Sequence, residues 1–309
     1  MSPAAVSISP GPVGAFGKIP SSGDFVEAGT VGPEMQALAR WMEEAVHALR
    51  AIDAAVEPVR FLFTPLAGGR ALVGTLGPST DRVGRTFPLA VACAATVRPD
   101  DLSLVPGAFQ HFLEGAEGTI LGRAPRMSAA ELAAAVRRLA PPGPAEVERE
   151  RGERKEGLAR PIGELWRSAY GDASHALRFY GVRTLLLATR QVRAREPVGV
   201  RVVVDCPVAC AADVRDWLSL VGGCLDWVRA PTIFWRADRT RLMVSAGPAP
   251  AGVLGAMGAS PIDASWIWPL STRRDEAVAE AKEALEAPIR RILDDPGAPV
   301  SALRDAMRA

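Results

Sequence analysis

The sequence predicts an α/β protein, and three observations lead to that prediction. Short apolar runs alternate with amphipathic helical stretches, which is the pattern of a sheet covered by helices. The 309 residues suffice for one large or two ordinary domains with a buried core. Hydrophobic residues make up 48% of the chain and charged residues 23%, with a formal net charge of +1, which is typical of a soluble globular protein. A net charge this close to zero argues against a protein that binds nucleic acid through the overall charge of its surface.

The amino-terminal half predicts a helix, a hairpin and a further strand. The small, proline-rich segment 1–13 is expected to be loosely held. Apolar residues then recur on one helical stripe over 33–52, and the runs VRFLFTPL (59–66) and ALVGTLGP (71–78) predict strands joined by a glycine turn. A loop leads into another strand over 87–97, and a helical pattern interrupted near Gly118 and Pro125 covers 102–139.

The carboxy-terminal half predicts a charged helix, a second block of strands and closing helices. Residues 146–160 carry both charge signs at helical spacing. The runs LRFYGVRTLLLATR (177–190), VGVRVVVDCPV (198–208) and PTIFWRADRTRLMVSAGP (231–248) indicate strands, with an amphipathic helix expected over 211–228. From Thr272 onward we expect a charged helix, a break at 295–297 and a short final helix.

Several sequence features predict a cytoplasmic protein with reduced thiols. The amino terminus has no basic region followed by an apolar run, so a signal peptide is not expected. No apolar stretch approaches the ~18 residues of a membrane span. The four cysteines, at positions 93, 206, 210 and 224, are irregularly spaced and do not resemble a disulfide framework.

The stretch GAFGKIPSSGDF (14–25) raises the question of a phosphate-binding loop. Such a loop needs a glycine, four residues and then Gly-Lys-Ser/Thr before a helix. Here the first glycine position is Pro12, Ile19 replaces the metal-binding hydroxyl, and Pro20 disfavours a helix start at that point. The sequence therefore argues against nucleotide chemistry at Lys18.

Other catalytic and metal motifs are also disfavoured. Neither a Gly-x-Gly-x-x-Gly fingerprint between strand and helix nor a Gly-x-Ser-x-Gly elbow occurs in the chain. Cys206, Cys210 and Cys224 lack a fourth ligand nearby in sequence, so we favour small apolar packing roles over zinc. Asp172 and His175, in DASH, favour a structural role over catalysis. We expect no cofactor and no metal.

Two glycine-rich loops of opposite charge remain, GKIPSSGDF (17–25) and STDRVGRTFPL (79–89). Glycine permits tight turns, and Asp24 or Asp81 can then meet the guanidinium of Arg82 or Arg85. We interpret this arrangement as a structural clamp in which Phe25 and Phe87 hold the loops to the core. A catalytic Asp/Arg pair is the alternative.

These loops also carry a family resemblance. FGKIPSSGDFV, a helix containing RWMEEAV, and GPSTDRVGRTFPL together resemble the TagF (ImpM) family of type VI secretion-associated proteins. The resemblance is specific over residues 14 to about 97 and weaker over 199–260. The positions that carry it are Phe16, Gly17, Lys18, Pro20, Gly23, Asp24, Phe25, Asp81, Gly84, Arg85, Phe87, Pro88 and Leu89, and Arg82 lies inside the second motif.

The resemblance implies a fold and a function. The implied fold is a three-layer α/β/α sandwich with a central mixed sheet, here with a carboxy-terminal helical extension. The implied function is a non-enzymatic cytoplasmic regulator that acts post-translationally by contacting a forkhead-associated-domain scaffold protein. On this basis we expect a flexible segment 1–13, a TagF-like domain over 14–271 with a charged helical insert at about 143–165, and carboxy-terminal helices over 272–309.

Partner binding through aromatic anchors is expected, with Trp235, Trp266 and Trp268 as candidates. We expect neither nucleic-acid binding nor membrane insertion. Two alternatives stay open at this point. One is a scaffold or adaptor of another secretion or motility system that docks through residues 272–309. The other is a hydrolase that uses Asp24, Asp81 and Arg85.

Overall fold

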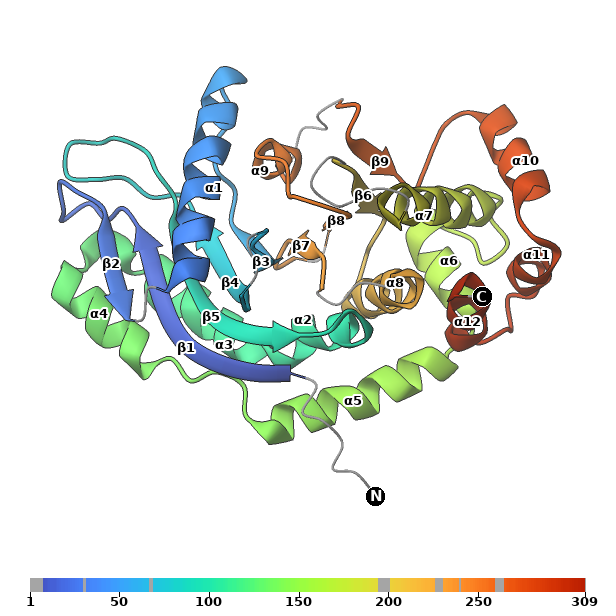
Figure 1. The fold of residues 1–309 in the computed structure, drawn as a ribbon, viewed down its shortest axis with the longest axis horizontal. Helices are drawn as coiled ribbons and strands as arrows, with labels where there is room; N and C mark the ends of the chain where they lie inside the picture. Colours follow the sequence, from blue (N-terminus) through green and yellow to red (C-terminus); the bar gives the residue numbers. More distant parts are fainter. Residues whose placement is uncertain are drawn as a thin grey trace.

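The structure is a computed structural model that describes residues 8–29, 32–66, 69–193, 201–225, 230–238, 240–258 and 264–308. Figure 1 shows a curved sheet with helices on both faces. This confirms the predicted α/β/α arrangement and the helical carboxy-terminal part.

A nine-stranded sheet forms the middle layer of the described chain, in the order β2-β1-β5-β4-β3-β7-β8-β6-β9. Neighbouring strands are antiparallel except for the parallel pair β6 and β9, so the sheet is mixed. The strands are β1 (Ile8–Gly17), β2 (Val26–Gly29), β3 (Val59–Phe63), β4 (Ala71–Gly77), β5 (Leu89–Val97), β6 (Val203–Cys206), β7 (Thr232–Trp235), β8 (Leu242–Ser245) and β9 (Ile267–Pro269).

Helices α1 (Pro33–Ala51) and α9 (Val253–Ala256) cover one face of the sheet (Figure 1). The opposite face carries a 3₁₀ turn (Pro99–Leu104), α2 (Val105–Ala108), α3 (Gln110–Gly115), a π-helical turn (Ala116–Leu121), a second 3₁₀ turn (Ala124–Arg126), α4 (Ala129–Arg138), α5 (Pro144–Ala159), α6 (Ile162–Tyr170), α7 (Leu177–Arg193) and α8 (Ala211–Cys224). The chain ends with α10 (Asp275–Ala284), α11 (Ala287–Asp294) and α12 (Val300–Arg308).

Strand alternation explains why one sheet supports two cores. Successive side chains of a strand point to opposite faces. Phe61 and Phe63 of β3 therefore pack against α1, while Leu62 between them packs with the helices of the other face. The indole N–H of Trp41, on α1, donates to the carbonyl of Ala249 at 2.9 Å, which ties this helix to the segment before α9.

Residues 177–190, expected to form a strand, are helical in α7, so that prediction is wrong. Phe179, Val182, Leu185 and Leu186 are all buried, at intervals that fit the 3.6-residue period of a helix. The three consecutive leucines suggested a fully buried strand, whereas the seventeen-residue length of the segment favours a helix.

The amino-terminal segment also differs from the prediction over residues 8–13, whereas residues 1–7 lie outside the described residues. Residues 8–13, expected to be loosely held, belong to β1, where Ile8 is opposite Val97 of β5 and is buried. The strand is irregular between Pro10 and Val13, and Arg70 donates to the Ser9 carbonyl at 3.1 Å. Cross-strand pairing therefore orders a segment whose composition suggested a tail.

The carboxy-terminal helices pack on the second half of the molecule. Helix α12 lies against α8 and α5, and α10 lies against α7. The expected helix over 211–228 is α8 as far as Cys224, and Val228 lies outside the described residues. A membrane-crossing helix, which needs both length and sustained hydropathy, does not occur in the part of the chain that the structure describes.

Candidate functional site

The sheet brings the two sequence motifs together. The first follows β1, and the second connects β4 to β5. Strand β5 lies between β1 and β4, with Phe16 opposite Ala90 and Gly77 opposite Leu89. The end of β1 is therefore beside the start of β5, and loops separated by about sixty residues in sequence come into contact.

Asp81 is the centre of the contact between the loops. Its carboxylate is 2% exposed and accepts from the Lys18 ammonium at 2.9 Å and from the Arg85 guanidinium at 2.6 Å. The backbone N–H groups of Val83 and Arg85 donate to its other oxygen at 3.0 and 2.9 Å. The carboxylate is thus bound by two cations and two amides.

These bonds fix the charge state of Asp81. Burial by itself would raise the pKa of this carboxyl group. The hydrogen bonds from Lys18, from the backbone and side chain of Arg85, and from the Val83 N–H outweigh burial and hold the pKa well below its usual range. A carboxylate held ionised in this way is a poor general base, because it releases its hydrogen bonds only at a high cost.

Gly17 explains why the first motif needs glycine before the lysine. Its φ is +149°, and an added Cβ would lie 2.2 Å from the Pro88 carbonyl oxygen. The backbone of the first loop therefore lies directly on that of the second. The Ser79 hydroxyl adds a hydrogen bond to the Lys18 carbonyl at 2.6 Å.

Three aromatic rings cover the clamp. Phe16 and Phe25 stack with centroids 5.2 Å apart, and Phe87 meets Phe25 edge-on at 4.8 Å. The Lys18 ammonium lies 5.3 Å from the centre of the Phe25 ring. Phe87 is buried as expected, and Phe16 is buried as well. Phe25 was also expected to be anchored in the core, but it is 44% exposed and covers the clamp from outside.

The other residues of the first motif have smaller roles. Asp24 is exposed, and in the described part of the chain its carboxylate makes no ion pair with Arg82 or Arg85. Instead, Arg85 donates to the neighbouring Gly23 carbonyl at 2.7 Å, and the Arg82 N–H donates to the Ser22 carbonyl at 2.8 Å. The predicted acid–guanidinium contact is therefore made by Asp81 with Arg85, with Lys18 as a second partner.

The three candidate tryptophans lie in different surroundings. Trp235, on β7, is 2% exposed and belongs to the core, so it does not offer a surface to a partner in this conformation. Trp266 and Trp268 are partly buried and pack against opposite faces of the sheet. The aromatic segment near β9 does not form one patch.

An apolar groove of about 440 Å³ lies beside the motif loops. Its walls come from the end of α1 and the loop after it, the two motif loops, and the turn before α4. Residues that line it include Pro20, Leu49, Val56, Phe87, Leu121 and Pro125. Sequence reasoning did not find this groove, because five separate segments form it and none of them carries a distinctive motif.

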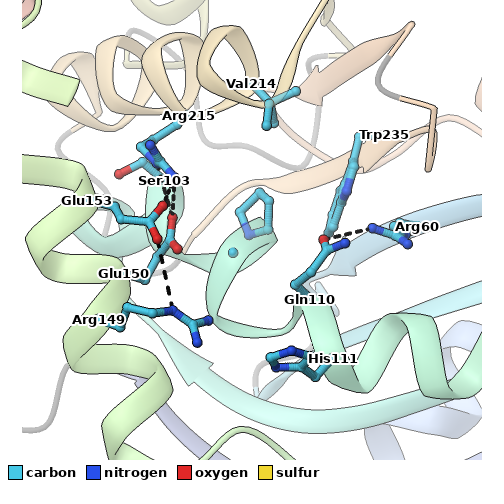
Figure 2. Close-up of a pocket in the computed structure, with 13 residues that line it drawn as sticks. Arg60, Ser103, Gln110, His111, Arg149, Glu150, Glu153, Val214, Arg215 and Trp235 are labelled. Atoms are coloured by element: carbon cyan, nitrogen blue, oxygen red, sulfur yellow. Dashed lines mark hydrogen bonds and ion pairs between the residues drawn. The ribbon is translucent and has the colours of Figure 1, made fainter. Parts of the chain in front are cut away.

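A second cavity, of about 340 Å³, is charged and lies among α3, α5, α8 and β7 (Figure 2). Arg215 joins Glu150 at 3.0 Å and Glu153 at 2.5 Å, and Arg60 donates to Gln110 at 3.1 Å. Burial raises the pKa of Glu150, and Arg215 opposes that shift. These opposite charges are paired within the wall, which is typical of a structural network.

Comparison with known proteins identifies the part of the chain that carries the clamp. Residues 14–139 match the model of the TagF N-terminal domain, described as type VI secretion system-associated. This part of the chain is similar to a TagF N-terminal domain. The match confirms the resemblance found in the two motifs, and it ends just after α4. The extension of a TagF-like region to residue 271 stays a prediction.

Among solved structures, the chain resembles the crystal structure of PA0076 from Pseudomonas aeruginosa PAO1. The identity is 19% and the TM-score 0.47, with 82% of this chain and 99% of that chain covered. No curated protein sequence matches the chain. Both motif loops and all five segments of the apolar groove's wall lie within the matched residues 14–139.

Proposed function

We propose that the protein is a non-enzymatic, cytoplasmic accessory protein of a type VI secretion system. It acts after translation by binding a scaffold component that carries a forkhead-associated domain. The observation that carries this proposal is the TagF N-terminal domain at residues 14–139, whose description associates it with type VI secretion. The scaffold partner comes from the family resemblance in the motif loops.

The chemistry of the clamp supports binding over turnover. Lys18 and Arg85 are both committed to Asp81, which already accepts four hydrogen bonds. A general base needs a pKa near the working pH and a free lone pair, and a nucleophile needs an adjacent base. Asp81 meets neither condition, and Asp24 lies outside this bonding network. The motif thus holds two loops in one conformation, which is what a recognition surface requires.

A direct binding measurement tests the proposal. The purified full chain would be titrated with the forkhead-associated scaffold protein of a type VI gene cluster, followed by biolayer interferometry. We expect a complex at micromolar concentration or tighter. The absence of binding to this scaffold at tens of micromolar would refute the choice of partner.

The same preparation tests the non-enzymatic part of the proposal. An Asp81→Asn variant would be compared with the wild-type chain in hydrolase assays on phosphate monoesters and on carboxylic esters. We expect no turnover from either protein. A rate that is present in the wild-type chain and lost in the variant would favour the hydrolase alternative.

A further inference from the structure

We propose that the apolar groove beside the motif loops binds an acidic, amphipathic segment of the partner protein, which rests on the binding function proposed above. The groove is the space of about 440 Å³ between the end of α1, the motif loops and the turn before α4. That volume lies within the ~300–1,000 Å³ of typical ligand pockets. Its lining is mainly apolar, so it offers burial to the apolar side chains of a ligand.

Exposed apolar residues cluster at this place. Five large hydrophobic side chains are notably exposed among the described residues, and three of them lie on the segments that form the groove or adjoin it. Ile52 follows Arg50 at the end of α1, Phe25 contacts the groove residue Phe87, and Val83 lies at the tip of the second motif. Their exposed fractions are 52%, 44% and 69%. Exposed apolar residues on the segments around an apolar groove favour an interaction site there.

The charges around the groove select the partner. Arginines exposed on its lining segments or next to them outnumber the exposed carboxylates. The arginines are Arg50, Arg82, Arg85, Arg123 and Arg126, and the carboxylates are Asp24, Asp53 and Glu57, whose side chain is 42% exposed. Buried Asp81 supplies one negative charge to the two cations Lys18 and Arg85, so this cluster also stays net positive. The whole chain carries a net charge of only +1, so this positive surplus is local and complements an acidic segment.

The walls of the groove are held in place before any partner binds. The Ser21 hydroxyl donates to the Met127 carbonyl at 2.7 Å, which joins the first motif to the turn before α4. Arg50 donates to the Thr86 carbonyl at 3.2 Å, which joins α1 to the second motif. Preorganised walls reduce the ordering cost of binding, and an amphipathic segment in such a groove is a recurrent recognition mode.

Site-specific photocrosslinking tests the proposal. Ala55, which is exposed and lines the groove, would be replaced by p-benzoylphenylalanine in cells that produce the type VI apparatus. Arg291, exposed on α11, would receive the same replacement as a control. We expect a crosslink from position 55, and not from position 291, to a segment rich in Asp and Glu with interspersed apolar residues. Mass spectrometry would map the crosslinked segment.

Affinity measurements with the scaffold protein provide the second part of the test. Ala55→Trp fills the groove, and the double variant Arg123→Glu/Arg126→Glu reverses its rim charge. Each is expected to weaken binding at least tenfold. The double variant Arg273→Glu/Arg291→Glu changes net charge equally and is expected to leave binding unchanged. These arginines lie just before α10 and on α11, helices that are at the opposite end of the molecule from α1 and α4 (Figure 1).

The outcomes separate the two proposals. A crosslink to an acidic segment of another protein, together with no binding of the scaffold at tens of micromolar, supports the groove and refutes the forkhead-associated partner. Scaffold binding that the groove variants leave unchanged refutes the groove and retains the proposed function. A crosslink to a basic segment or to a second copy of this chain, or no protein crosslink at position 55, also overturns the inference.

Discussion

The ion pair between Arg60 and Glu117 is the contact whose loss should most clearly destabilise the amino-terminal half of the molecule. Arg60 projects from β3 and is 4% exposed. Its Nε and Nη2 atoms lie 2.8 and 2.7 Å from the two oxygens of Glu117, in the π-helical turn, and Gln110 accepts a further bond at 3.1 Å. We consider the substitution Glu117→Gln, which keeps the size of the side chain and removes its charge.

The stability loss expected from Glu117→Gln is set by the Arg60 charge, which stays buried without its partner. Breaking a buried ion pair on one side costs ~3–5 kcal/mol, because the remaining charge stays unpaired. The Glu117 side chain is 23% exposed, so water reaches this pair and partly screens it. We therefore expect a loss of about 3 kcal/mol in the free energy of unfolding. At ~2 °C per kcal/mol for a chain of this size, the melting temperature should fall by about 6 °C.

Urea unfolding followed by circular dichroism measures this loss, and a double-mutant cycle isolates the pair. The cycle comprises Arg60→Met, Glu117→Leu and the double variant Arg60→Met/Glu117→Leu, which removes both charges and should lose less stability than the sum of these two single variants. Glu148→Gln is the matched control, because its pair with Arg151 is on the surface of α5 and should contribute under ~0.5 kcal/mol. A loss from Glu117→Gln no larger than that of the control, or strict additivity in the cycle, would refute the reasoning.

Three further predictions concern the clamp and the core. Gly17→Ala should lower the free energy of unfolding by about 2 kcal/mol or more, because the new Cβ meets the Pro88 carbonyl. Gly84 has a φ of +85° but open space around it, so Gly84→Ala should lower it by only about 1 kcal/mol. Thermal unfolding measures both losses. Because the pKa of Asp81 is depressed in the folded chain, the ionised carboxylate stabilises the fold at pH values above the ordinary aspartate pKa of ~4, and this stabilisation is lost as the pH falls below that value. The wild-type chain and Asp81→Asn should therefore converge in stability on acidification. A stability difference that stays constant with pH would contradict this. Trp235→Ala should lower the free energy of unfolding by ~3–5 kcal/mol, because the Trp235 side chain is 2% exposed. Trp268 is only partly buried, so Trp268→Ala should lower it clearly less. Equal losses from the two variants would contradict the burial argument.

Part of the candidate site could be predicted because its contacts are local or its motif is distinctive. Asp81 and Arg85 lie four residues apart, so their pairing was among the possibilities that the sequence allowed. The pairing of Lys18 with Asp81 joins residues 63 positions apart, and it depends on β1 lying next to β5. The charge and glycine content of the two loops did not show whether Asp24 or Asp81 would be the carboxylate that pairs with an arginine.

The sequence by itself determined the helical stripe of α1, the β3–β4 hairpin, the break before α12 and the identity of the motif loops, because periodicity and turn chemistry act between near neighbours. The tertiary structure decided that residues 177–193 are helical, that Trp235 is buried and that five segments enclose a groove. These outcomes depend on the order of the strands in the sheet and on which helix faces pack against which sheet face. Such contacts join residues that are distant in sequence, so the pattern of neighbouring residues does not predict them.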